Sequence, residues 1–131
     1  MNGLRMADDV LARLRQRGDL YDERAYLFVL ASIEYLQGKL PERRHVTGPE
    51  VTHACREFAL EQYGLMARSV LDHWGIRGTG DFGRIVYSLV DVGVLMTQPG
   101  DRIEDFDGVY GFEVFERDYV WGAQGGGGGG R

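Results

Sequence analysis

The feature that most constrains the fold is an apolar pattern of helical period between Thr79 and Gly93. Its side chains recur at intervals of three and four residues and are Phe82, Ile85, Val86, Leu89 and Val90. This spacing places them on one face of a helix, so the segment predicts an amphipathic α-helix. Thr79 is its expected N-cap, the Asp81 carboxylate suits the first turn, and Gly93 is the expected stop.

Four segments upstream carry similar signals. They predict a helix that starts at Asp8 or Asp9 and ends at Gly18, followed by helices over 23–39, 48–63 and 65–74. Asp22 is the expected cap of the second, and Thr47 with Glu50 forms a capping box before the third. A chain with this pattern is expected to be mostly helical, with about five helices.

The segments after Gly93 indicate strands. Val94-Leu95-Met96 is a short apolar run, and in 109–116 the side chains of Tyr110, Phe112 and Val114 alternate, with a turn-rich stretch between the two segments. Two helices followed by strand, loop and strand is the order of a winged helix. The expected fold is therefore mostly α (α+β), with a small C-terminal antiparallel β-hairpin of winged-helix type.

Length and composition favour one globular domain. The chain has 131 residues, of which 44% are hydrophobic and 27% are charged. The expected domain spans 1–121, and the glycine-rich end, 122–131, is the expected flexible tail. A single cysteine, Cys55, excludes an internal disulfide, and neither a signal peptide nor a membrane span is recognisable, so a cytoplasmic location without a membrane partner is expected.

The tripeptide Asp81-Phe82-Gly83 matches the metal-binding motif of protein kinases. A kinase domain needs a glycine-rich loop, a strand lysine and a catalytic loop before this motif, and about twice this length. None of these is present in the sequence, so we interpret the tripeptide as a helix start.

No residue pattern predicts a catalytic, cofactor or metal site. The soft metal ligands are His45, His53, Cys55 and His73. His53 and Cys55 are two residues apart on one expected helix and so point to different faces. The acidic loop 101–108 fails the EF-hand pattern, because that alignment puts Ile103 and Val114 at two essential ligand positions. We therefore expect a protein that is not an enzyme; a deep pocket around His53, Glu57 and His73 would favour one.

Charge favours a protein partner over nucleic acid. Residues 94–118 carry seven carboxylates against Arg102 and Arg117, which would repel a phosphate backbone. We expect a cytoplasmic protein-interaction module that binds itself or another protein through the strand edge and the exposed face of the helix 81–92. The expected contact residues are Arg84, Tyr87, Asp91, Tyr110, Phe112, Tyr119 and Trp121.

A nucleic-acid-binding regulator is the alternative, since arginines are concentrated near the N-terminus and could gather into a basic patch. These residues are Arg13, Arg15, Arg17, Arg24, Arg43 and Arg44, with His45 beside them. The contacts expected for nucleic acid are Arg43, Arg44, Arg77 and Arg84.

Several sequence blocks point to a relationship. They are Tyr21 with Ala25-Tyr26 and Phe28, RHVTGPE at 44–50, ALEQYGLMARSVLDHWGIRGTGDFG at 59–83, IVYSLVDVGVL at 85–95 and EDFDGVYGFEVF at 104–115. Through these blocks, over about residues 8–119, the chain resembles a family of short bacterial proteins restricted to Verrucomicrobia and Planctomycetes, whose function is uncharacterised. The resemblance implies a single-domain bacterial protein, and it implies no activity, cofactor or catalytic residue.

Overall fold

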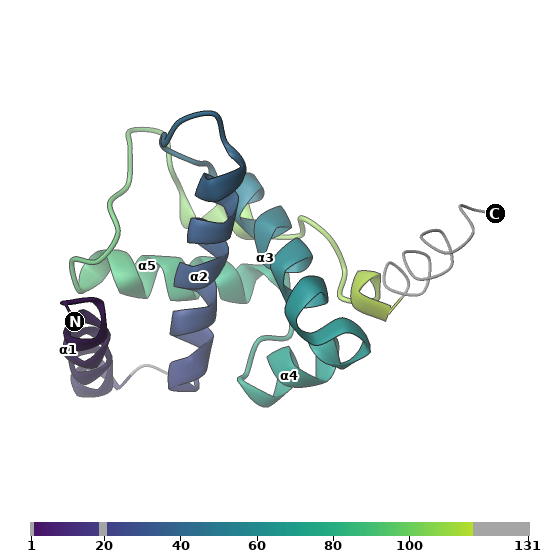
Figure 1. Ribbon diagram of the computed structural model, residues 1–131, viewed down its shortest axis with the longest axis horizontal. Coiled ribbons are helices and arrows are strands. Elements are labelled where there is room, and N and C mark those ends of the chain that lie inside the picture. The colour runs from purple at the N-terminus through teal and green to yellow at the C-terminus, as the bar shows by residue number, and fades with distance from the viewer. Residues whose placement is uncertain (1, 19–20, 117–131) are drawn as a thin grey trace.

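The computed structural model describes residues 2–18 and 21–116 (Figure 1). The described part contains five α-helices and two short 3₁₀ helices. They are α1 (Asn2–Arg17), α2 (Glu23–Lys39), α3 (Gly48–Tyr63), η1 (Gly64–Met66), α4 (Ala67–His73), α5 (Thr79–Asp91) and η2 (Ile103–Phe106). The prediction of a mostly helical chain with about five helices is confirmed.

Helix α2 stands at the centre of the fold. It packs beside α3 and is crossed by α5, while η2 packs against both α5 and α3 (Figure 1). Every helix from α2 to α5 contributes side chains without solvent exposure, among them Val29, Cys55, Leu71 and Ile85. The apolar stripes that predicted the helices therefore meet in one core.

The caps expected for α2 and α3 are confirmed. The Asp22 carboxylate accepts a hydrogen bond from the Arg24 amide at 2.9 Å. At α3, the Thr47 hydroxyl accepts from the Glu50 amide at 3.3 Å and the Glu50 carboxylate accepts from the Thr47 amide at 2.8 Å. Amides at a helix start have no partner within the helix, so these side chains determine where each helix begins.

Helix α5 is capped differently from what was expected. Its N-cap is Gly78, and the Asp81 carboxylate accepts from the amides of Arg77 at 2.8 Å and Gly78 at 3.1 Å. The Thr79 hydroxyl instead accepts from the Val109 amide at 3.2 Å. The prediction of Thr79 as the cap is thus wrong, because the threonine anchors a distant segment while Asp81 caps the helix.

The last residue of the kinase-like tripeptide, Gly83, has a packing role. A Cβ atom on Gly83 would lie 2.8 Å from Cβ of Phe106, and one on Gly48 would lie 3.0 Å from Cε1 of the same ring. These distances are at or below the closest approach of real carbon atoms. The two glycines form a notch between α5 and α3, and Phe106 of η2 fills it.

The predicted β-hairpin, and with it the winged-helix fold, is wrong: residues 21–116 contain no β-strand. Between the two segments, turns are present as expected, because the carboxylates of Asp101 and Asp105 accept from the amides of Gln98 at 2.8 Å and Arg102 at 3.0 Å. In the first segment, the amides of Val94 and Leu95 donate to the Leu89 carbonyl at 2.9 and 3.3 Å, so they bond to the end of α5 instead of pairing with a strand. In the second, the neighbouring residues Val114 and Phe115 are both buried. A strand with one buried face would expose one of them.

Backbone hydrogen bonds between residues three apart take the place of strand pairing near residue 115. The Val114 amide donates to the Gly111 carbonyl at 3.2 Å and the Phe115 amide donates to the Phe112 carbonyl at 3.1 Å. Residues 114–116 are therefore helical, and Phe112 and Phe115 lie in the core with their ring centroids 4.8 Å apart. The alternation that predicted a strand is therefore explained by core packing.

Helix α1 is joined to the end of α5 by polar contacts. The Arg13 guanidinium donates to the Val92 carbonyl at 2.6 Å, and Arg17 lies 3.1 Å from the Asp91 carboxylate. No helix of the described residues is both long and apolar enough to cross a membrane. The expected glycine tail, 122–131, lies outside the described residues.

Candidate functional site

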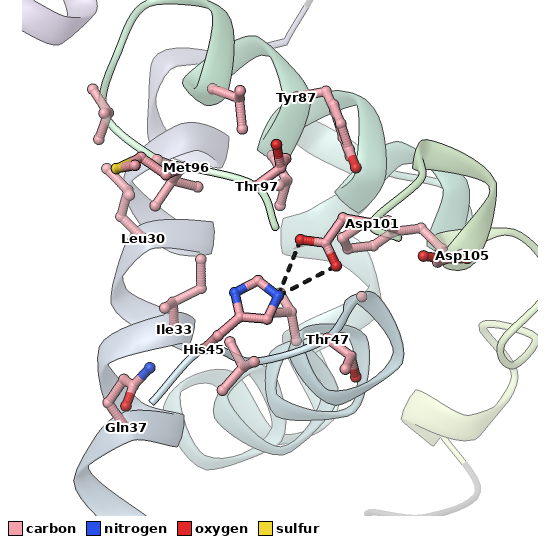
Figure 2. Close-up of a pocket in the computed structure, with 18 of the residues that line it drawn as sticks. Leu30, Ile33, Gln37, His45, Thr47, Tyr87, Met96, Thr97, Asp101 and Asp105 are labelled. Atoms are coloured by element: carbon pink, nitrogen blue, oxygen red, sulfur yellow. Dashed lines mark hydrogen bonds and ion pairs between the residues drawn. The ribbon is translucent and has the colours of Figure 1, made fainter. Parts of the chain in front are cut away.

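A cavity of about 440 Å³ opens between α2, α5 and the loops that precede α3 and η2. Its lining comes from α2, the segment 43–51, α5, and the segment 94–106 (Figure 2). The notch residues Gly48 and Phe106 belong to this lining. The packing of η2 therefore determines the shape of the cavity.

The walls of the cavity are mainly aliphatic. Helix α2 contributes Leu30 and Ile33, three residues apart, and α5 contributes Val86 and Val90, four residues apart. Such intervals place each pair on one helix face. All four side chains are half-buried, which leaves apolar surface accessible within the cavity.

A contact between a histidine and a carboxylate joins the two loops at the cavity. Nε2 of His45 lies 3.0 and 3.2 Å from the two carboxylate oxygens of Asp101, as the dashed lines in Figure 2 show. The same carboxylate accepts from the Gln98 amide, so a turn fixes its position. His45 and Asp101 are 56 residues apart in sequence, and their contact ties the loop before α3 to the loop after α5.

Tyr87 is the polar residue that α5 adds to the lining. Burial raises the pKa of its hydroxyl, and the nearby carboxylates of Asp101, Asp105 and Glu104 raise it further. In Figure 2, Tyr87, Asp101 and Asp105 lie on the side opposite Leu30 and Ile33. The cavity therefore has an aliphatic side and an electronegative side.

The two arginines beside α2 are paired with carboxylates. Arg43 donates to both oxygens of Glu34 at 3.1 and 3.0 Å, and Arg44 donates to both oxygens of Glu50 at 3.2 and 2.9 Å. The Gln37 side chain also holds the backbone of Arg44 in place. Bidentate pairing fixes each guanidinium group beside its carboxylate.

The other arginines expected to contact nucleic acid are also paired. Arg77 lies 2.8 Å from Asp72, and Arg84 lies 2.8 Å from Asp81. The N-terminal arginines each bond to a carboxylate as well, in the pairs Arg13–Asp9, Arg15–Glu23, Arg17–Asp91 and Arg24–Asp22. The fold brings Arg43 and Arg44 to the cavity, but it places Arg77 and Arg84 near the start of α5.

The residues expected to contact a protein partner are dispersed. Tyr87 lines the cavity, Arg84 and Asp91 are exposed on α5, and Phe112 is only 6% exposed. The Tyr110 hydroxyl donates to the Thr52 carbonyl at 2.7 Å, and burial raises the pKa of this tyrosine. Tyr119 and Trp121 lie outside the described residues. Of the described members of this set, the structure brings only Tyr87 to the cavity.

The residues considered for metal binding do not gather. Within 2–18 and 21–116, no three His, Cys, Asp or Glu side chains are placed to hold a metal ion. Cys55 is fully buried, and burial raises the pKa of its thiol to about 12. His53 is exposed, with its ring 5.6 Å from that of Tyr110.

Sequence reasoning named His45 and Tyr87 but missed the cavity they share. The aliphatic residues of α2 and α5 match the pattern of core stripes, and Asp101 matches that of a solvated acidic loop. One signal was available in Gln98-Pro99-Gly100-Asp101, since Asp at the end of a proline–glycine turn can bond back to the turn backbone. Pairing with His45 depends on tertiary structure and has no such signal.

Comparison of the chain with models of protein families, with curated proteins and with solved structures found no match. The resemblance to the bacterial family therefore stays a prediction, and the geometry of the cavity has to carry any functional proposal.

Proposed function

We propose that the protein is a non-enzymatic interaction module that holds an apolar side chain of a protein partner in the cavity between α2 and α5. The observation that carries the proposal is the cavity itself, about 440 Å³ with aliphatic walls and a few polar groups. Binding pockets typically have volumes of about 300–1,000 Å³ and this kind of lining. The proposal moves the contact surface from the predicted strand edge to the cavity.

Apolar surface around the cavity supports a macromolecular partner. Met96 belongs to the loop that lines the cavity and is 87% exposed, and Ile103, at the start of η2, is 38% exposed. A small ligand held within the cavity would leave these side chains in water. A protein segment would cover them, and a buried apolar anchor surrounded by further contacts is the usual anatomy of an interface.

The lining favours binding over catalysis. His45 and Asp101 could form a base and its orienting carboxylate, but a nucleophile would have to lie beside them. The described lining contains no serine, cysteine or lysine. Of its two threonines, Thr47 accepts a hydrogen bond from the Glu50 amide, and Thr97 makes no hydrogen bond to His45 that could activate its hydroxyl. The pairing of the arginines likewise favours a protein partner over a phosphate backbone.

Selection from a displayed library of random 12-residue peptides tests the proposal. Val90→Trp fills the cavity from α5, and Leu65→Trp is the matched control, because Leu65 is 60% exposed and is not among the lining residues. Peptides selected on the wild-type protein should bind the Leu65→Trp variant unchanged and the Val90→Trp variant at least about tenfold more weakly, since a filled pocket excludes the anchor. Circular dichroism checks that both variants are folded. Equal binding to all three proteins would refute the proposal.

A further inference from the structure

The charges around the cavity are not balanced in the same way at both sides. On the α2 side, each arginine is matched by one glutamate in the pairs Arg43–Glu34 and Arg44–Glu50. Bidentate pairs of this kind leave little net charge for a partner to sense. This side offers mainly its aliphatic surface.

The α5 and η2 side keeps an excess of negative charge. Asp101 and Asp105 line the cavity and Glu104 lies between them in sequence. Arg102, which also lines the cavity, is the one arginine of this segment, so carboxylates outnumber it. The Asp105 carboxylate accepts a hydrogen bond from the backbone amide of Arg102. Burial raises the pKa of Tyr87 most, and these three carboxylates raise it further, which is consistent with a negative potential at this side.

We infer that the partner segment carries a lysine or arginine close to the apolar side chain that enters the cavity. The inference rests on the proposed function and adds the chemistry of the partner to it. A cation at this point would lie near Asp105 and Tyr87, which line the cavity, and the exposed carboxylate of Glu104 is next to Asp105 in sequence. An acidic residue there would be repelled, so charge selects among apolar segments that fit the cavity equally well.

The peptides selected on the wild-type protein provide the test. We expect those that lose binding to the Val90→Trp variant to share a large apolar residue with Lys or Arg within three positions. Replacing that Lys or Arg by Gln should weaken binding about fivefold at low salt, the scale of a partly exposed ion pair. High salt should reduce the difference, because solvent ions screen such pairs.

Two double variants separate the effect of negative charge near the cavity from the effect of the overall charge of the protein. Glu104→Gln with Asp105→Asn removes the proposed contacts, while the side-chain amide oxygen introduced at position 105 can still accept from the Arg102 amide. Asp101 is kept because it bonds to His45. Glu61→Gln with Glu113→Gln is the matched control, since both glutamates are exposed and neither lines the cavity. Basic peptides should lose about fivefold in affinity on the first variant and little on the second.

The outcomes distinguish the two proposals. Cavity-dependent peptides that are neutral or acidic near the anchor, or that bind the Glu104→Gln, Asp105→Asn variant as tightly as the wild type, would overturn the inference and leave the proposed function in place. If no selected peptide discriminates between the wild type and the Val90→Trp variant, both proposals fail.

Discussion

Replacement of Gly83 by alanine tests how closely η2 approaches α5. A Cβ atom on Gly83 would lie 2.8, 2.9 and 3.0 Å from Cβ, Cγ and Cδ1 of Phe106. Two of these atoms are at the base of the side chain, where rotation about χ angles gives little relief. The added methyl group can be accommodated only if the backbone of η2 moves.

Two opposing effects determine how much Gly83→Ala changes the free energy of unfolding. Alanine is favoured over glycine in a helix by about 1 kcal/mol. Overpacking of a core position typically costs about 1–3 kcal/mol. Gly83→Ala should therefore lower the free energy of unfolding by up to about 2 kcal/mol. Gly38→Ala in α2 is the control, because its Cβ would meet no atom within 4 Å and only the helix preference remains.

Urea unfolding followed by circular dichroism at about 222 nm, the helix band, measures both variants. The cost of overpacking should appear as a difference of about 1–3 kcal/mol in the free energy of unfolding, with Gly83→Ala less stable than Gly38→Ala. The denaturant slopes of the two variants should be the same. Since Phe106 also lines the cavity, the Gly83→Ala variant should bind the selected peptides more weakly than the Gly38→Ala variant. If Gly83→Ala is as stable as Gly38→Ala, Phe106 does not pack against Gly83 as described and the argument fails.

Two further predictions concern single contacts. Tyr110→Phe removes the hydrogen bond from the tyrosine hydroxyl to the Thr52 carbonyl. In the same urea assay it should lower the free energy of unfolding by about 1 kcal/mol. A variant as stable as the wild type would show that this bond does not contribute to stability. Hydrogen bonds from Arg44 and the Thr47 amide lower the pKa of Glu50 from 4.5 to about 2. The stabilisation that the ionised Glu50 carboxylate gives the fold is present above pH 4.5 and is lost as the pH falls toward 2. The Glu50→Gln variant should therefore be less stable than the wild type at neutral pH. Its thermal midpoint should also fall less than that of the wild type as the pH is lowered through this range. An equally steep fall in the Glu50→Gln variant would contradict this assignment.

The helices could be predicted because their signals are local. The caps of α2 and α3 use side chains within three residues of the amides they bind, in Asp22 and in the Thr47–Glu50 box. Apolar spacing then gives the buried face without knowledge of the partner helix. These elements need no information from distant residues.

The C-terminal segment could not be predicted in the same way, because its backbone is determined by distant contacts. Phe106 is positioned by two glycines that lie 23 and 58 residues earlier in sequence, and the Val109 amide bonds to Thr79. Side chains that alternate along the sequence satisfied a strand pattern, but the packing of Phe115 required a turn. Tertiary contacts of this kind routinely override β-propensity.

From the sequence, only individual residues of the candidate site could be predicted. The sequence analysis named each of four lining residues, which are Arg43, Arg44, His45 and Tyr87. The cavity between them depends on the relative positions of the loop before α3 and the loop after α5. The apolar pattern of α2 and α5 cannot distinguish a side chain that packs in the core from one that faces a cavity. A cavity of this kind therefore has to be found from the structure.

The packing of Phe106 has a consequence for synthesis of the chain. The ribosome delivers α2, α3 and α5 before residues 103–116, so the notch of Gly48 and Gly83 is empty while the last part of the domain is still being made. A nascent chain at that stage exposes the surface that Phe106, Phe112 and Phe115 later cover, and exposed apolar surface is what chaperones bind and what drives aggregation. The helices emerge first, but this part of the core is complete only when Phe106, Phe112 and Phe115 have been translated.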